Sequence, residues 1–233
     1  MARMRTAAII PARGGSKRIP RKNLARVGGR TLVERAIESA ARCDAVWVST
    51  DDVEIERVAL EAGARVRRRP AMHARDESST EDAITDWLGH LAALDEVPDV
   101  VVLLQPTSPL RTVEHVTEAV QLLARTGADS LCSVTVDHAH HFAGRLIPSI
   151  DGVPRWRPDR PWSYRPRTQT VPPIAHENGA IWCFTTSHFR ETGRRDGGRC
   201  LAYEMSRSVS IDIDGPNDLL VAEAMWSAVR QRA

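Results

Sequence analysis

The residues best suited to chemistry lie near the N-terminus, where cationic side chains crowd into a short stretch: Arg13, Lys17, Arg18, Arg21 and Lys22. Gly14, Gly15 and Ser16 lie among them, and glycine lets a backbone turn sharply and bring its N–H groups close to an anion. Arginine forks and lysine point charges both suit phosphate oxygens. The stretch matches neither G-x-x-x-x-G-K-[ST] nor G-x-G-x-x-G. It favours a phosphate-binding loop, with a solvated turn or a weak nucleic-acid patch as the alternatives.

Two carboxylates near the other end of the chain offer a second kind of chemistry. Asp212 and Asp214 lie two positions apart in residues 210–214, whose pattern predicts a strand. Side chains two apart on a strand share a face, so these carboxylates repel each other unless a cation lies between them. Residues 215–218 have the pattern of a helix start, which makes Asp218 a capping residue.

The elements that must position these groups alternate along the chain. The pattern predicts strands over 7–10, 44–50, 64–70, 98–105, 130–136 and 177–184, and helices over 31–42, 51–63, 112–125 and 219–230, with a helix start at 76–82. Such alternation indicates a parallel sheet with helices on both faces. Ligands of such sheets bind beyond the carboxyl ends of the strands, which is where the basic stretch lies.

Composition narrows the classes of function. The chain has 233 residues, enough for one α/β domain or two small ones, and a net charge of +2, which disfavours general nucleic-acid binding. The four cysteines are scattered without C-x-x-C spacing, so a zinc site or a disulfide framework is not expected. No apolar run approaches 18 residues. We expect a soluble, reduced, cytoplasmic protein without a membrane partner.

Motifs along the whole chain resemble those of the cytidylyltransferases that activate sialic acids and related nine-carbon 2-keto sugar acids. They are the stretch 7–24, Leu-Leu-Gln-Pro-Thr-Ser-Pro-Leu-Arg at 103–111, Asn-Gly-Ala-Ile at 178–181 and Ile-Asp-Ile-Asp at 211–214. The resemblance implies one Rossmann-like, doubly wound, mostly parallel sheet of nucleotidyltransferase type over residues 1–233. It also implies a reaction in which CTP and a 2-keto sugar acid give a CMP-sugar acid and pyrophosphate.

The resemblance assigns roles to particular residues. For the nucleotide they are Arg13, Gly14, Ser16 and Lys22 at the phosphates and Asn23, Arg69 and Thr80 at the ribose and base. For the acceptor they are Gln105, Arg167, Asn178 and Trp182. For Mg²⁺ they are Asp212 and Asp214. Catalysis itself falls to Lys22, Arg13 and Asp214, mainly through positioning and charge neutralisation.

Several of these residues also have plain structural interpretations. Arg69 would add charge to an edge strand and so prevent other strands from pairing with it. Thr80 or a neighbour would cap a helix, and Gln105 would form hydrogen bonds at the end of a strand. Asp51 and Asp52 could bind a metal, but capping of the following helix is the favoured interpretation.

Residues 137–175 break the alternation of strands and helices. Between 142 and 174 lie seven of the 14 prolines and six arginines against two aspartates, a local charge of +4. In the family this segment resembles an arm that packs on a second subunit, so we expect a homodimer with a dimerisation and acceptor arm. The alternative is a mobile surface insertion.

The acceptor is where the sequence departs from its relatives. No lysine occurs near Phe142, Trp182 replaces a tyrosine common in the family, and residues 195–201 lack a pair of phenylalanines that some relatives have. Arg167 lies in a Pro-Arg-x-Gln context typical of a carboxylate-binding arginine. We expect an acidic acceptor, foremost an acylated nine-carbon sugar acid, with an eight-carbon 2-keto acid or a phosphonate as the alternative. A non-catalytic nucleotide-binding module and an RNA-binding domain are the rivals from other classes.

Overall fold

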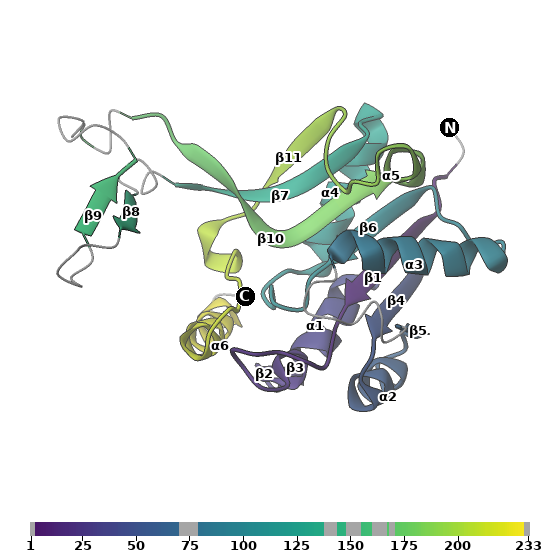
Figure 1. Ribbon diagram of the computed structural model, residues 1–233, viewed down its shortest axis with the longest axis horizontal. Coiled ribbons are helices and arrows are strands. Elements are labelled where there is room, and N and C mark those ends of the chain that lie inside the picture. The colour runs from purple at the N-terminus through teal and green to yellow at the C-terminus, as the bar shows by residue number, and fades with distance from the viewer. Residues whose placement is uncertain are drawn as a thin grey trace.

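The computed structural model describes residues 3–69, 79–137, 144–147, 155–159, 167 and 171–230. Within them, seven strands form one sheet in the order β11-β7-β10-β6-β1-β4-β5 (Figure 1). In chain order the strands are β1 (Thr6–Pro11), β4 (Ala45–Thr50), β5 (Arg65–Arg68), β6 (Val100–Leu104), β7 (Ser130–Asp137), β10 (Ile174–Thr185) and β11 (Cys200–Glu204). Only β10 runs antiparallel to its neighbours, β6 and β7, and the other pairs in the sheet are parallel.

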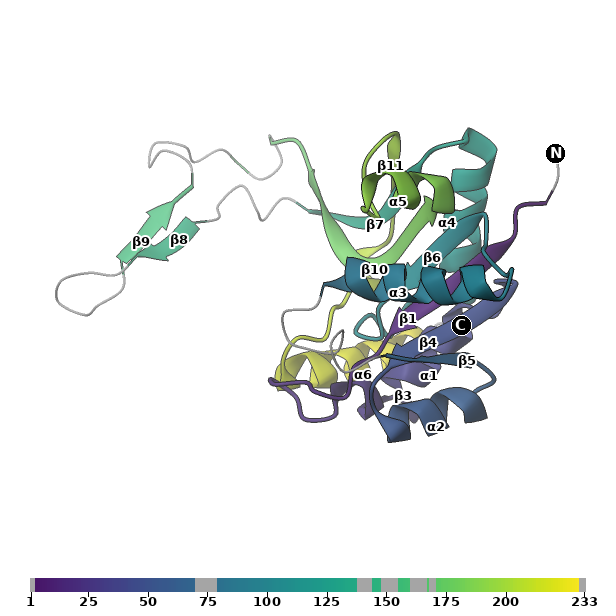
Figure 2. The same ribbon diagram turned by 45° about the vertical axis from the view of Figure 1, so that its right-hand side comes forward.

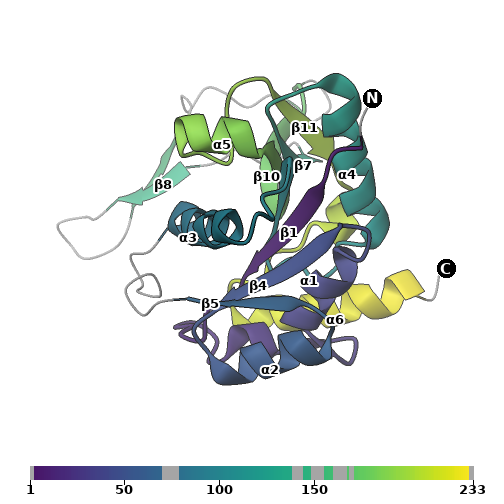
Figure 3. The same cartoon turned by 90° about the vertical axis from the view of Figure 1, so that its right-hand side faces the viewer.

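Helices cover both faces of this sheet (Figure 3). They are α1 (Leu32–Ser39), α2 (Val53–Glu61), α3 (Thr80–Ala93), α4 (Val113–Thr126), α5 (Thr186–Thr192) and α6 (Pro216–Arg230), with short 3₁₀ turns at Lys22–Leu24 and Arg207–Val209. The core has one apolar cluster on the side of α1, α2 and α4 and another on the side of α3 and α5. The predicted α/β fold with a mostly parallel sheet is confirmed. None of the described helices is long and apolar enough to cross a membrane.

The central strands are apolar on both faces, as their position between two helical layers requires. Every residue of β6 is fully buried, and the same is true of Ala8, Ile9 and Ile10 in β1. β1 pairs with β4 on one side and with β6 on the other. The carboxyl end of β1, from which the basic stretch departs, therefore lies at the middle of the sheet edge.

Helix starts are capped as the sequence indicates. Thr31 and Glu34 form the predicted capping box of α1. Asp52 accepts from two backbone N–H groups at the start of α2, which confirms capping as its role. At α3 the capping residue is Ser79, with Asp82 completing the box, and Thr80 is the first helical residue.

The segment 210–214, expected to be a strand, has no regular secondary structure. Its backbone contacts go to loops: the N–H of Ile213 donates to the carbonyl of Thr107 (2.9 Å), and the Ile213 carbonyl accepts from Lys22 Nζ (2.8 Å). The alternation nevertheless holds. Ile213 is fully buried in a cluster with residues of α1, of α6 and of β2 (Arg26–Val27), which pairs with β3 (Arg30–Thr31). Asp212 and Asp214 are solvent accessible.

Most of the expected arm at 137–175 lies outside the described residues. The described part includes a two-stranded antiparallel sheet, β8 (Gly144–Ile147) with β9 (Arg155–Pro158), drawn apart from the main sheet in Figures 1 and 2. Its role in dimerisation stays a prediction.

Candidate active site

The basic stretch leaves β1 as a loop that is tied to the start of α2. The N–H of Gly14 donates to Asp51 Oδ1 at 2.9 Å. A Cβ on Gly14 would lie 2.7 Å from Asp52 Oδ2, so the loop can approach this closely only with glycine there. Further along, Arg21 adopts a left-handed backbone (φ 57°) and forms an ion pair with Glu54 at the start of α2. The acidic residues at the end of β4 thus shape the loop.

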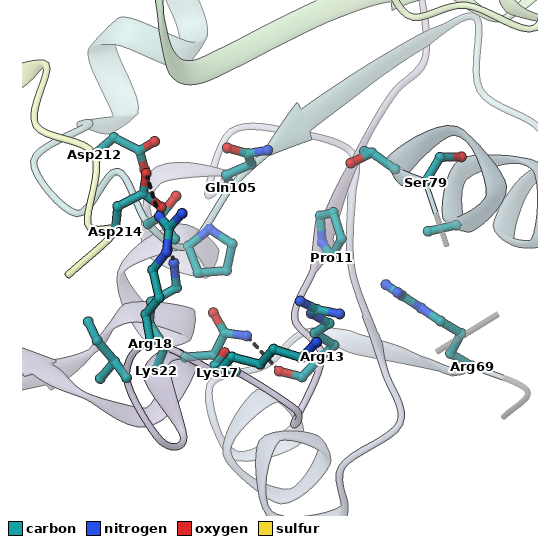
Figure 4. A pocket seen from close by; sticks show the side chains of 17 residues that line it. Pro11, Arg13, Lys17, Arg18, Lys22, Arg69, Ser79, Gln105, Asp212 and Asp214 are labelled. Carbon is teal, nitrogen blue, oxygen red and sulfur yellow. Dashed lines mark hydrogen bonds and ion pairs between the residues drawn. The ribbon is translucent and has the colours of Figure 1, made fainter. Parts of the chain in front are cut away.

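The loop forms one wall of a cavity of about 520 Å³ at the carboxyl edge of the sheet (Figure 4). Its lining brings together residues from distant parts of the chain: Pro11, Arg13, Ser16, Lys17, Arg18, Ile19, Lys22, Asn23, Arg69, Ser79, Thr80, Ala83, Gln105, Pro106, Thr107, Asp212 and Asp214. Every expected nucleotide and metal residue except Gly14 is in this lining. Lys17 and Arg18, two further cations of the basic stretch, line it too. Ser79 and Thr107 also line it, although the sequence analysis gave neither a role in the site.

Cations and carboxylates meet at one end of this cavity. Asp214 lies 3.8 Å from Lys22 Nζ and 3.4 Å from a guanidinium nitrogen of Arg18. Figure 4 shows Asp212 and Asp214 on the same side, facing these cations. Asp218 accepts from the N–H groups of Asp214 and Gly215, which confirms it as a capping residue.

Asp212 lies in an environment that disfavours its charge. Although it faces the cavity, the surrounding protein removes part of its hydration and so raises the pKa of its carboxyl. A hydrogen bond with Thr107 opposes this rise, and the negative charge of Asp214 adds to it. A bound cation would relieve both effects. Among the described residues no three His, Cys, Asp or Glu side chains gather as a metal cluster. Two carboxylates suffice for Mg²⁺ when phosphates and water supply the other ligands.

The opposite end of the cavity is lined by Arg69 and the start of α3. Arg69 is only 8% exposed and donates to the hydroxyl (3.2 Å) and carbonyl (3.3 Å) of Ser49. Its burial lowers the pKa of the guanidinium. Asn23 also lines the cavity, and its Nδ2 donates to the Arg13 carbonyl at 2.9 Å, which anchors the basic loop. Figure 4 shows Arg69 and Ser79 across the cavity from Asp212.

A second cavity of about 430 Å³ adjoins the first. It is lined by Gln105, His176, Glu177, Asn178, Gly179, Trp182, Ser210 and Asp212. Gln105 and Asp212 line both cavities. Three of the four expected acceptor residues, Gln105, Asn178 and Trp182, therefore lie together. The fourth, Arg167, is exposed and is not in the described lining of either cavity.

The Asn178 amide is largely engaged by the protein. Its Oδ1 accepts from Ser133 Oγ (2.6 Å) and the Ala180 N–H (3.2 Å), and its Nδ2 donates to Ser210 Oγ (2.9 Å). The β10–β7 register shifts between Glu177 and Trp182, where Gly179 has φ 72°. Asn178 thus holds an irregular part of β10 in shape beside the cavity.

A buried arginine, to which the sequence analysis gave no role, holds the backbone beside the second cavity. Arg111 donates to the carbonyls of Gln105 (3.1 Å) and Ala180 (2.6 Å) and to Ser39 Oγ (2.9 Å). Its complete burial lowers its pKa to about 9. Its place at the end of the motif 103–111 was the available signal, but nothing in the sequence shows that β10 passes beside it.

Comparison with known proteins agrees with this geometry. Residues 7–143 match the family described as Cytidylyltransferase. The chain belongs to the cytidylyltransferase family. It is 37% identical over 219 residues to N-acylneuraminate cytidylyltransferase B of Danio rerio, covering 93% of this chain and 50% of that one. It is 40% identical over 128 residues to CMP-N,N'-diacetyllegionaminic acid synthase of Legionella pneumophila, covering 53% of this chain and 55% of that one.

These relatives confirm the resemblance read from the sequence motifs. The chain spans about half the length of the curated relatives it matches. A solved structure of CMP:2-keto-3-deoxy-manno-octonic acid synthetase complexed with CTP shares the fold, with a TM-score of 0.68 and 16% identity over 97% of this chain and 99% of that one. At that identity the likeness concerns the fold alone.

Proposed function

We propose that this cytidylyltransferase transfers CMP from CTP to a 2-keto sugar acid of the sialic acid class and releases pyrophosphate. One observation carries the proposal: a cavity with a basic loop on one wall and two aspartates on another opens beside a second, polar cavity, and Asp212 lines both. A nucleoside triphosphate and a hydroxylated acid can then meet at one carboxylate. The names of the relatives point to the same substrates.

The first cavity suits the nucleotide. Arg13, Ser16 and Lys22 line it where phosphates would lie, and guanidinium and ammonium groups bind phosphate oxygens strongly. Arg69 and Thr80 line the far end, where the ribose and base would lie. Arg69 is already fixed by its hydrogen bonds to Ser49, so little conformational freedom would be lost on binding.

We propose Asp212 and Asp214 as the residues that hold Mg²⁺. The raised pKa of Asp212 and its closeness to a second carboxylate fit a site built for a cation. When bound there, Mg²⁺ would neutralise charge on the phosphates and acidify the attacking hydroxyl. Because Asp212 lines both cavities, an ion held there would lie near their boundary.

The remaining chemistry is positioning. The anomeric hydroxyl of the acceptor attacks the α-phosphorus in line, the bond to the β-phosphate oxygen breaks, and pyrophosphate leaves. Lys22, fixed by the Ile213 carbonyl and Asp214, would offer its remaining donor capacity to the phosphate on which charge develops. Arg13 would bind the same chain of phosphates, and Gln105 would orient the acceptor at the cavity boundary.

The second cavity suits a polar, hydroxylated acceptor. Its described lining offers the amide of Gln105 and the carboxylates of Glu177 and Asp212, while the Asn178 amide, engaged by Ser133, Ala180 and Ser210, shapes the wall. We propose that Arg167, on a homodimer's arm, supplies the cation for the acceptor's own carboxylate. An acylated nine-carbon acid is the first candidate. An eight-carbon 2-keto acid or a phosphonate, taking CMP by the same chemistry, is the second.

A pyrophosphate-release assay tests the proposal. The protein is incubated with CTP and Mg²⁺ and with N-acetylneuraminate, other nine-carbon acids, an eight-carbon 2-keto acid or a simple phosphonate. We expect release that depends on both Mg²⁺ and a sugar acid, with the CMP-sugar as co-product. CTP binding without turnover for any acceptor would favour a non-catalytic nucleotide-binding module. Preference for a neutral sugar phosphate over every 2-keto acid would overturn the acceptor class.

A further inference from the structure

A buried tryptophan in the wall of the second cavity has a cation over its ring. Trp182 lines that cavity and is only 4% exposed. The guanidinium carbon of Arg195, from the connection between α5 and β11, lies 4.8 Å from the centroid of the Trp182 ring. At this separation a guanidinium is attracted to the face of an indole. Arg195 thus contacts a residue that shapes the cavity, without being in the cavity's described lining.

A carboxylate of α3 holds Arg195 in turn. Nη1 of Arg195 donates to Glu81 Oε1 at 2.7 Å, and the two side chains are 24% and 33% exposed. Partial burial weakens the screening of such a pair by solvent. Glu81 follows Thr80, which lines the first cavity. The ion pair therefore joins the wall of one cavity to the helix start beside the other.

No hydrogen bond from the described part of the chain fixes the indole. Trp182 Nε1 is buried and has no hydrogen-bond partner among the residues that the structure describes. The ring packs within the apolar cluster on the α3 and α5 face, which includes Ile84 and Phe184. Apolar contacts are not directional, so the cation is the one directional contact in the described surroundings of the ring.

We propose that Arg195 is a positioning residue for the acceptor. With Glu81 as its counter-ion, it holds the Trp182 ring as the wall of the second cavity and so determines which acids fit there. The inference rests on the proposed function, because it takes the second cavity to be the acceptor's. It adds a residue that touches neither substrate but governs acceptor selection through one that does.

Steady-state kinetics of Arg195→Met test the proposal. Methionine keeps much of the side-chain length but removes the charge and the ion pair. We expect the KM for the sugar acid to rise about tenfold, the scale of a lost, partly desolvated cation–π contact, while the KM for CTP stays within about twofold. Relative kcat/KM values across the acceptor panel should shift toward bulkier acids. Arg195→Lys should recover part of the loss, and Glu81→Gln should change the acceptor KM in the same direction by less.

A neighbouring arginine and a double-mutant cycle provide the controls. Arg194 is 68% exposed and pairs with Asp196, so Arg194→Met should leave the acceptor KM unchanged. In a Trp182→Leu background, Arg195→Met should cause a much smaller further rise, because no aromatic ring remains for the guanidinium to contact. A purely structural role would instead give additive effects and would raise both KM values.

Each outcome decides the matter. A folded Arg195→Met protein with an unchanged acceptor KM and panel overturns the inference, and so does additivity with Trp182→Leu. If Arg195→Met does not fold, unchanged acceptor KM values in both Arg195→Lys and Glu81→Gln overturn it. A wild-type protein inactive with every acid overturns the proposed function together with this inference. An active wild type with indifferent variants overturns this inference alone.

Discussion

Lys22 and Asp214 meet at one end of the first cavity although 192 positions separate them: Nζ lies 3.8 Å from Oδ1 of the carboxylate, and the same Nζ donates to the Ile213 carbonyl at 2.8 Å. The basic loop after β1 and the acidic segment before α6 are thereby joined. The contact keeps a cation close to the carboxylate that we propose as a Mg²⁺ ligand. The first two predictions concern these two residues.

Asp214→Asn should leave the fold intact and lower turnover by about 100-fold or more, the scale of losing one preorganised electrostatic contact. The reason is that an amide keeps the shape of the carboxylate but binds Mg²⁺ poorly. The measurement is kcat in the pyrophosphate assay, with circular dichroism to check folding. Glu61→Gln, which removes an exposed carboxylate on α2, is the matched control and should be fully active. Near-normal turnover of a folded Asp214→Asn protein would remove Asp214 from the metal site.

Lys22→Ala should lower kcat more than it weakens CTP binding. This follows if Lys22 contacts the α-phosphate, where charge develops in the transition state. The measurement compares kcat and KM for CTP with a direct binding constant from calorimetry. Lys17→Ala is the comparison, because Lys17 is a second lysine of the basic stretch that lines the same cavity. If kcat is unchanged and only KM rises, Lys22 binds phosphate without assisting the chemistry.

Asp212→Asn should raise the melting temperature of the metal-free protein at neutral pH. The pKa of Asp212 is raised in the folded protein, so its ionised form costs stability, and this cost appears as pH rises through the unfolded and then the folded pKa. The difference between variant and wild type should shrink as pH falls, because a protonated Asp212 resembles asparagine. The measurement is thermal unfolding in EDTA across acid and neutral pH. A wild type more stable than the variant at neutral pH would contradict the raised pKa of Asp212.

The segment 137–175 predicts a homodimer with a shared site. Its excess of arginine and proline and its two tryptophans would be unusual on a free surface. Light scattering at the concentrations of the activity assay should give twice the mass of the chain, and dilution that dissociates the dimer should reduce activity. A fully active monomer would refute the arm's proposed role.

The sequence predicted the sheet well because its signals are local. The buried runs of β1, β4, β6 and β7 and the capping box at Thr31 need no knowledge of distant contacts. The sequence analysis did not predict α5, β11 or the antiparallel direction of β10. The last of these depends on where the chain returns to the sheet. The segment 210–214 was wrongly expected to be a strand. Its apolar and acidic residues do alternate between buried and exposed, but its backbone bonds to Thr107 and Lys22 and not to a strand.

The candidate site was predicted as a set of residues more readily than as a geometry. The motifs identified the nucleotide and metal residues, and in the structure all of them except Gly14 line one cavity. They could not show that Asn178 is engaged by Ser133 and Ser210, because those contacts join segments far apart in the chain. Nor could they show that Arg195 lies over Trp182, because that contact depends on how the chain turns through α5 between them. Kinetics of variants test the roles proposed for Arg13, Lys22, Asp212 and Asp214.

Gln105 and Asp212 belong to both cavities, and this sharing limits how the enzyme can be redesigned. A substitution at either residue alters the surroundings of two ligands at once, so its kinetic effect cannot be attributed to one substrate. Engineering of a new acceptor preference is better begun at Trp182, which lines only the second cavity. If the two substrates occupy the cavities as proposed, the first to bind would also complete the wall of the compartment that the second one enters.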